Sequence, residues 1–173
     1  MTYITTYTGK HFDPIEIDAE LIDIRDIAHA LSLLCRANGH LRHFYSVAQH
    51  CVNCCREAEA RGYSEKLQLA CLLHDAAEAY LSDVTRPVKA LLPEYQAVED
   101  RLLDVIWEKY IGEVTETERK LVFEIDDAIL SLEFKELMPQ PLSEDYKNLR
   151  SKPQTEYRNP LDVENNYLRC FEK

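Results

Sequence analysis

Apolar residues recur every three to four positions along most of the chain, a spacing typical of amphipathic helices. Only 4 glycines occur among the 173 residues, so few positions interrupt this pattern. The pattern and its end signals predict helices over residues 24–37, 44–60, 64–81, 94–110, 115–138 and 162–172. The start differs, because residues 3–12 are rich in Thr and Tyr around a Thr-Gly-Lys turn and predict a short β-hairpin. We therefore predict an all-α fold with a short N-terminal hairpin.

The chain length favours a single domain, large enough to bury a sizeable hydrophobic core. The expected parts are a hairpin, a helical core and a C-terminal extension, at residues 3–12, about 24–138 and 139–173. Pro139, Pro141 and Pro153 mark a polar, irregular segment in the extension. The role of residues 139–158 stays open between a subunit contact and a mobile lid.

Hydrophobic residues make up 46% of the chain and charged residues 29%, which is ordinary for a globular domain. No apolar run is long enough to span a bilayer, and the first residues, MTYITTYTGK, lack the features of a signal peptide. We therefore expect a cytoplasmic protein with no membrane partner. The net charge of −11 argues against a nucleic-acid duplex as partner, and a small anionic substrate would need positive charge supplied locally.

Six cysteines in a chain without a secretion signal are expected to be free thiols. Cys51, Cys54 and Cys55 in CVNCC lie on one face of a helix and are expected to pack as small apolar side chains. A structural zinc site would need a second Cys-x-x-Cys, which the sequence lacks.

A histidine and several carboxylates interrupt an apolar helical stretch in CLLHDAAEAYLSDVTRPVK, residues 71–89. On a continuous helix His74 and Glu78 share one face, and Asp75 is rotated by about 100° from His74. Such groups are costly to bury without partners. A divalent cation would compensate, because imidazole and carboxylate groups are its usual ligands.

Two further candidate ligands, His50 and Asp126, lie on the apolar sides of other predicted helices. Taken singly, His50 also fits a hydrogen-bonded core histidine, and Asp126 a solvated helix position. His43 competes with His50 for the role, and Asp127 competes with Asp126. Together with the His-Asp pair at 74–75, one histidine and one aspartate would complete a four-ligand metal site built from three helices.

The motifs around these residues resemble those of the HD-domain metal-dependent phosphohydrolases, in particular the branch of small proteins similar to 5′-deoxynucleotidases. The family scheme H…HD…D matches His50 in FYSVAQH, His74-Asp75 in LLHDAAEAYLSDVTRPVK and Asp126 in VFEIDDAILSLEFKELM. The second of these stretches follows the pattern HDxxE with a later D-x-x-x-P-x-K. The resemblance covers about residues 24–138. It implies an HD-domain helical bundle in which these four residues bind a divalent metal ion (Mn, Co, Mg, Zn, Fe or Ni).

The resemblance also implies roles for residues around the metal. Glu78 would be the general acid/base, and Asp83 a second catalytic carboxylate that orients water or the leaving group. Arg36 matches an arginine that binds the substrate phosphate. Weaker candidates for substrate binding are Arg42, Arg86 and Lys89. His29, seven residues before Arg36, is expected to be a packed core histidine.

We therefore expect an enzyme, a nucleotide phosphohydrolase that releases phosphate from (deoxy)nucleoside 5′-monophosphates. The alternative is a deoxynucleoside triphosphate triphosphohydrolase (dNTPase) that releases tripolyphosphate at the same metal. A nucleotide-binding protein with a dead site would have broken ligands, and a cyclic-nucleotide phosphodiesterase would usually be a larger domain. Ala37 stands where relatives usually have Trp, which leaves base and sugar preference open. Proteins of this kind often associate, so a homo-oligomer, dimer or larger, is expected.

Overall fold

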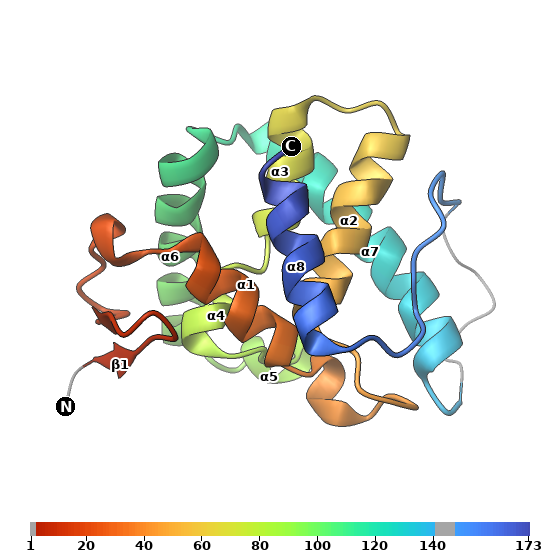
Figure 1. Cartoon of the computed structure of the whole chain (residues 1–173), viewed down its shortest axis with the longest axis horizontal. Helices are drawn as coiled ribbons and strands as arrows, with labels where there is room; N and C mark the ends of the chain where they lie inside the picture. The colour runs from red at the N-terminus through yellow and green to blue at the C-terminus, as the bar shows by residue number, and fades with distance from the viewer. Residues whose placement is uncertain (1–2, 141–147) are drawn as a thin grey trace.

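The computed structural model describes residues 3–140 and 148–173 and consists mostly of helices (Figure 1). The strands are β1 Ile4–Thr5 and β2 His11–Phe12, and the helices are α1 Ile24–Leu33, α2 Val47–Ala60, α3 Glu65–Leu73, α4 Glu78–Leu81, α5 Arg86–Lys89, α6 Pro93–Ile111, α7 Glu116–Leu137 and α8 Pro160–Phe171. Short 3₁₀ turns, η1 Ala19–Leu21 and η2 Arg36–Gly39, precede and follow α1. The predicted all-α fold with a short N-terminal hairpin is confirmed. Pro141, which falls in the predicted irregular segment, lies outside the described residues.

The N-terminal hairpin is antiparallel, with Ile4 opposite Phe12 and Thr5 opposite His11. Its turn is closed by the Gly9 amide, which donates to the Thr6 carbonyl at 2.9 Å. Gly9 has φ +84°, a conformation that glycine adopts without steric cost. Phe12 is fully buried and joins the main core, so the hairpin is anchored on the helices.

Side-chain caps define where several helices begin. Ser46 Oγ accepts from the Gln49 amide at the start of α2, and Ser64 Oγ from the Leu67 amide at the start of α3. The predicted capping box of Thr115 and Glu118 is present at the start of α7. These caps satisfy amides that have no acceptor within the helix itself.

Helix α2 lies in the middle of the molecule and contacts α1, α3, α7 and α8 (Figure 1). Its cysteines Cys51, Cys54 and Cys55 are buried free thiols, which confirms the expected packing role. Because α2 is covered on nearly all sides, any polar residue on it must find a partner inside the protein.

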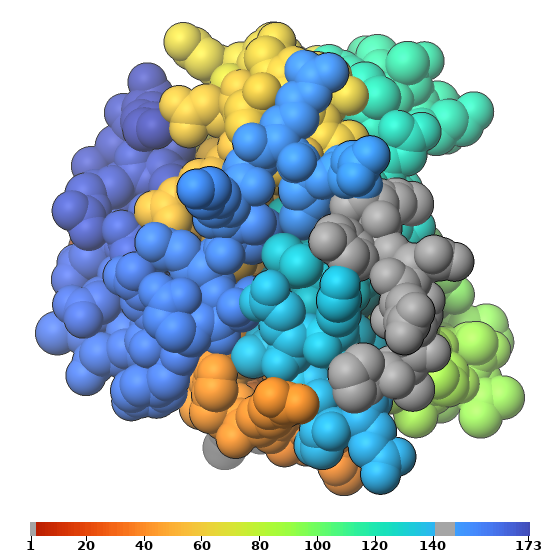
Figure 2. All heavy atoms as spheres, turned by 90° about the vertical axis from the view of Figure 1, so that its right-hand side faces the viewer, coloured from red at the N-terminus to blue at the C-terminus, as the bar shows by residue number. Residues whose placement is uncertain are grey.

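One covered face of α2 is polar and holds the segment 148–159, which crosses the surface beside α7 (Figure 2). Gln49 Nε2 donates to the Gln154 carbonyl at 2.9 Å. Asn53 Oδ1 accepts from the Gln154 amide at 3.1 Å, and Glu57 accepts from the Ser151 amide at 2.8 Å. The three α2 side chains are spaced by four residues, so one stripe of the helix satisfies the backbone of an irregular segment.

Two helix boundaries differ from the sequence prediction around the first loop. The first helix ends at Leu33 instead of residue 37, because Cys35 pairs with Ser46 in an antiparallel bridge. Arg36 donates its amide to the Tyr45 carbonyl at 2.9 Å, which draws this chain segment away from the helix axis. The second helix begins at Val47 instead of residue 44, because Ser46 is its N-cap.

The helix predicted over residues 64–81 is wrong as a continuous element. It ends at Leu73, and residues 74–77 form a tighter turn before α4. The His74 ring bonds the Cys71 carbonyl at 2.8 Å, the acceptor that the Asp75 amide would use in a continuing α-helix. The following bonds, such as that from the Glu78 amide to the Asp75 carbonyl at 3.0 Å, span three residues instead of four.

Three further predictions from the sequence need smaller corrections: the connector at residues 85–87, the start of the last helix and the position of His29. Residues 85–87, predicted as a connector, lead into the short helix α5, which Pro87 can join because its missing amide is not needed in a first turn. The last helix begins at Pro160, two residues earlier than predicted. His29 is not a core residue, because its side chain is 28% exposed and bonds Glu164 on α8. None of the described helices is both long and apolar enough to cross a membrane.

Candidate metal centre

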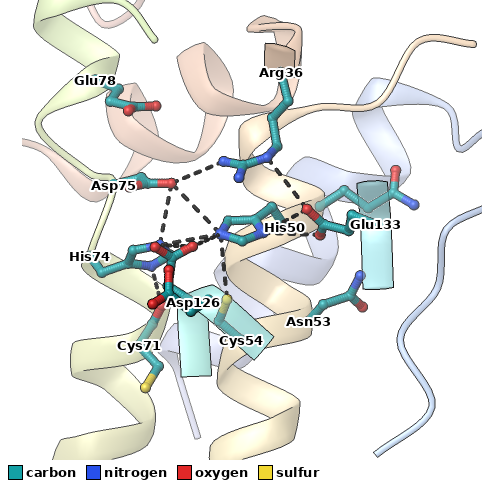
Figure 3. A network of polar contacts seen from close by, with 12 residues as sticks. Arg36, His50, Asn53, Cys54, Cys71, His74, Asp75, Glu78, Asp126 and Glu133 are labelled. Atoms are coloured by element: carbon teal, nitrogen blue, oxygen red, sulfur yellow. Dashed lines mark hydrogen bonds and ion pairs between the residues drawn. The ribbon is translucent and has the colours of Figure 1, made fainter. Parts of the chain in front are cut away.

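The four predicted ligands converge in one place between α2, α7 and the turn after α3 (Figure 3). His50 comes from α2, His74 and Asp75 from the turn, and Asp126 from α7. His50 is fully buried, His74 is 6% exposed and Asp126 is 8% exposed. The structure thus brings together residues that lie up to 76 positions apart in the sequence.

The Nε2 atoms of the two histidines face each other at 3.3 Å. On the other side of each ring, His50 Nδ1 lies 2.9 Å from Glu133 Oε1, and His74 Nδ1 lies 2.8 Å from the Cys71 carbonyl. A carbonyl and an ionised carboxylate only accept hydrogen bonds, so both Nδ1 atoms are the protonated ones in the neutral rings. In neutral rings both Nε2 lone pairs would point to the same place, where a bound cation would satisfy them; without a cation, a protonated Nε2 atom donates to Asp126 instead.

Two carboxylates complete the cluster. Asp126 Oδ1 lies 3.0 Å from His50 Nε2 and 3.8 Å from His74 Nε2. Asp75 Oδ2 lies 3.3 Å from His74 Nε2 and 3.9 Å from His50 Nε2. Ligand atoms about 2.1 Å from one cation, at angles of about 90–110°, are about 3.0–3.5 Å apart. Three of the distances, 3.3, 3.0 and 3.3 Å, lie in this range, and the two of 3.8 and 3.9 Å exceed it. The donor set therefore suits a divalent metal ion in chemistry, and the closest pairs also suit it in spacing.

The electrostatics of the cluster favour positive charge. Burial lowers the pKa of His74, but the neighbouring Asp75 carboxylate raises it, and the net result is well above the usual value. Burial raises the pKa of Asp126, but hydrogen bonds from His50 and His74 lower it, and the net result is well below the usual value. The site thus holds ionised carboxylates in a buried place and gains from any bound cation.

Cysteine sulfur atoms also lie close to the facing Nε2 atoms of the two histidines. Cys54 Sγ is 3.5 Å from His50 Nε2. Two groups of side chains have ligand atoms close enough to share a metal ion, and these are His50 with Cys54 and His74, and Cys51 with His74 and Asp75. The sequence analysis assigned these cysteines to packing alone, because it could not place the helix face relative to the histidines.

Glu78 lies beside Asp75 rather than beside His74 (Figure 3). In a turn with three-residue spacing, positions 75 and 78 point the same way, whereas 74 and 78 are about 120° apart. Glu78 is 5% exposed, and its Oε2 atom has no hydrogen-bond partner within the described residues. Burial raises its pKa well above the usual value, and Asp75 and Asp83 add to the shift. This carboxyl group is therefore suited to hold a proton.

Asp83 follows α4 in an irregular stretch and is partly buried. Burial raises its pKa, and the charges of Arg36, Asp75 and Lys89 also act on it. Their influence places the Asp83 carboxyl in the same electrostatic environment as the predicted ligands. No hydrogen bond joins its side chain to another residue of the described chain, so its predicted role stays a prediction.

Three of the candidate cations lie at the cluster. Arg36 Nη1 is 3.2 Å from Asp75 Oδ2, with a side chain only 11% exposed. Lys89 Nζ is 2.7 Å from Glu99 and 3.8 Å from Glu78. Arg86 Nη2 is 2.7 Å from Asp126 Oδ2 and also bonds the neighbouring Asp127. Local positive charge is therefore present in this acidic chain.

Arg42 is placed differently from the other candidates. Its side chain is exposed, and its amide donates to the Leu137 carbonyl at 2.9 Å. No ion pair joins Arg42 to the clustered residues in the part of the chain that the structure describes. Substrate binding by Arg42 stays a prediction, and the position of Arg42 adds no support to it.

The two rival ligands lie outside the cluster. His43 is partly exposed, and its Nδ1 atom bonds the neighbouring Phe44 carbonyl at 3.0 Å. Asp127 has a side chain 46% exposed and pairs with Arg86. Burial and contacts thus favour His50 over His43, and Asp126 over Asp127.

Glu133 is a buried site residue that the sequence analysis missed. It is 1% exposed on α7 and contacts His50 and Arg36. Its sequence signal is weak, because the stretch SLEFKEL offers two glutamates and only the helical register separates them. Glu133 lies seven residues, or about two turns, after Asp126 and so points to the same side of the helix.

Comparison with known proteins gives relatives without an assigned activity. No known protein-family model matches the chain. The chain is 46% identical over 110 residues to the uncharacterized Escherichia coli protein YfdR, a match that covers 64% of this chain and 59% of YfdR. An uncharacterized protein of Rhodobacter capsulatus is 40% identical over 101 residues, covering 55% of this chain and 51% of that protein. The chain thus spans between half and three fifths of the curated relatives it matches, and their names give no function to transfer.

Proposed function

We propose that this protein is a metal-dependent phosphohydrolase of the HD type that releases phosphate from deoxynucleoside 5′-monophosphates. One observation carries the proposal, the meeting of two histidine Nε2 atoms at 3.3 Å between the carboxylates of Asp75 and Asp126. A buried cluster of this kind has little structural purpose without a cation, because burying unpaired charges is costly. The H…HD…D motif of the sequence and the helical fold agree with it.

A divalent cation, when held by His50, His74, Asp75 and Asp126, would supply a Lewis acid for a phosphoryl oxygen and lower the pKa of water. Imidazole and carboxylate ligands suit Mn, Co, Zn, Fe and Ni, and Mg accepts the carboxylates. The nearby thiols of Cys51 and Cys54 favour the borderline metals over Mg.

The chain's own residues account for the other needs of the reaction. Arg36 has a guanidinium that is fixed beside Asp75 and suits a phosphate oxygen geometrically. Glu78, whose Oε2 atom has no partner, would transfer a proton to or from the reacting oxygen. Asp83 would orient the water or the leaving group.

A triphosphate substrate is the second candidate, and a specific observation favours it. Arg86 and Lys89 lie against different carboxylates of the cluster, Asp126 and Glu78 respectively. Two such cations beside Arg36 would suit a longer phosphate chain. They are already paired with carboxylates, however, so a triphosphate would have to displace those contacts. We therefore place the monophosphate first.

The proposal is tested by a release screen over the common nucleotides. The chelated protein is supplied with Mn²⁺, Co²⁺ or Mg²⁺, and phosphate and tripolyphosphate are measured with deoxynucleoside mono- and triphosphates as substrates. Phosphate from monophosphates, abolished by chelation, is the expected result. Tripolyphosphate would select the second candidate. Absence of release with a bound metal would contradict hydrolysis and leave a nucleotide-binding protein.

A further inference from the structure

Glu133 is a further buried carboxylate. It lies at the Nδ1 side of the His50 ring, away from the facing Nε2 atoms. Its Oε1 atom accepts a hydrogen bond from Tyr45 Oη at 2.6 Å and lies 2.9 Å from His50 Nδ1. Its Oε2 atom lies 3.0 Å from His50 Nδ1 and 3.5 Å from Arg36 Nε. The carboxylate is therefore held by three different side chains, all from outside its own helix. Figure 3 shows two of them, His50 and Arg36, on the side toward Asp75 and His74.

The network continues from Glu133 toward the surface. Tyr45 Oη accepts from Asn53 Nδ2 at 2.9 Å, and the same amide nitrogen donates to the Gln154 carbonyl at 3.0 Å. The Gln154 amide in turn donates to Asn53 Oδ1 at 3.1 Å. Segment 148–159 is thereby joined to the metal centre through a continuous chain of hydrogen bonds.

The Glu133 carboxylate constrains two groups that face the candidate metal centre, the His50 ring and the Arg36 guanidinium. His50 binds a cation through Nε2 only while its proton stays on Nδ1, and an acceptor at Nδ1 keeps it there. Arg36 lies between Glu133 and Asp75, with contacts of 3.5 and 3.2 Å, so its guanidinium has one defined position. Without Glu133, Arg36 would be free to turn fully onto Asp75, and the His50 ring could rotate or change tautomer.

We propose that Glu133 is a positioning residue that sets the metal-binding nitrogen of His50 and the guanidinium of Arg36 at the same time. This inference rests on the proposed function for the role of Arg36, but its effect on metal binding does not require any activity. The proposal also gives segment 148–159 a role. Its Gln154 carbonyl accepts a hydrogen bond from Asn53, Asn53 also donates to Tyr45, and Tyr45 donates to Glu133.

The test is the Co²⁺ affinity of the full chain, measured by competition with a chelator. Glu133→Gln keeps the size of the side chain but removes its charge, and we expect about 10–100-fold weaker Co²⁺ binding. The visible Co²⁺ spectrum should also change, because the ligand field depends on the orientation of His50. Glu124→Gln is the matched control, since Glu124 is exposed on the same helix and the charge change is identical. Affinity and spectrum should stay at wild-type values in that control.

A second variant covers the case in which Glu133→Gln fails to fold. Tyr45→Phe keeps the carboxylate and removes one of its donors, and we expect a severalfold loss of Co²⁺ affinity with helicity retained. Wild-type affinity and spectrum in a folded Glu133→Gln protein, or in Tyr45→Phe if the first variant is unfolded, would overturn the proposal. Failure of the wild-type protein to bind any Co²⁺ would instead overturn the metal centre itself, so the two failures are distinguishable.

Discussion

At the scale of single residues, the buried carboxyl of Glu78 is the proposed site of proton transfer. It lies outside hydrogen-bond range of the histidines, and its Oε2 atom has no partner in the described chain. Glu78→Gln should therefore keep the metal ion and the fold, because glutamine preserves shape and polarity. Turnover should fall by about 10²–10⁴-fold, the usual effect of losing a positioned acid or base. Metal analysis paired with the rate on the best nucleotide checks both parts.

Two results would reassign Glu78. Loss of the metal together with activity would make Glu78 a ligand. Near-normal turnover would return it to a structural role and transfer the proton step to Asp83, which lies in the same charged environment.

Asp75 is the proposed ligand that also pairs with Arg36, so its removal should affect both metal and substrate. Asp75→Ala takes a carboxylate from the cluster and leaves Arg36 with Glu133 alone. We expect metal content and phosphate release to be lost together while the circular dichroism stays helical. Asp127→Ala is the control, since Asp127 is half-exposed and its side chain pairs with Arg86 rather than with the clustered histidines. Full metal content in Asp75→Ala would mean that the cation lies elsewhere.

The sequence could identify these residues because their types and spacing are unusual for an apolar stretch. Asp126 could not be separated from Asp127 without the register of α7, which the structure supplies by burying the first and exposing the second. Glu133 was out of reach for a similar reason. A glutamate near the end of a charged helix looks like a surface residue until its partners from other elements are known.

At the scale of elements, the tightened turn after α3 changes which side chains meet. A continuous helix over residues 64–81 would have set Glu78 over His74, but the three-residue spacing sets it over Asp75 instead. Apolar periodicity cannot reveal such a change, because the turn keeps Ala76 and Ala77 buried as a helix would. The helix caps, in contrast, were readable, since Ser64 and Thr115 act through their own side chains.

The segment 148–159 is tied to α2 by Glu57, and this contact should make stability depend on pH. Burial raises the pKa of Glu57, but hydrogen bonds from Ser151, Arg61 and the Arg150 amide lower it, and the net pKa is below its usual value. A carboxyl with a lowered folded-state pKa stabilises the protein above its unfolded pKa of about 4.3 and loses this contribution as the pH falls further. Chemical denaturation at pH 7 and at pH 3.5–4.5 should show that loss.

The variant Glu57→Gln isolates this contribution. It should lower the free energy of unfolding at pH 7 by about 1–3 kcal/mol, because buried amides lose a charged acceptor. Its stability should also fall less steeply with acid than that of the wild type. Glu59→Gln is the control, since Glu59 is exposed on the same helix and its side chain pairs with the exposed Lys173. Equal acid dependence in wild type and Glu57→Gln would contradict the assignment.

At the scale of the whole molecule, one hydrophobic core joins the hairpin, the helices α1–α3 and α8, and the long pair α6 and α7. The candidate metal centre lies inside this body, where α2, α7 and the turn after α3 approach one another (Figure 3). Subunit association, cytoplasmic location and the choice of nucleotide stay predictions, because they depend on partners and ligands outside a single chain.

The most direct test of the account is metal analysis of His50→Ala beside His43→Ala. The two histidines lie seven residues apart, yet only His50 is buried against His74 and Asp126. After reconstitution with Co²⁺ and removal of free metal, we predict about one bound ion in the wild type and in His43→Ala, and almost none in His50→Ala. Retention of the ion by His50→Ala, or its loss from His43→Ala alone, would contradict the proposed centre.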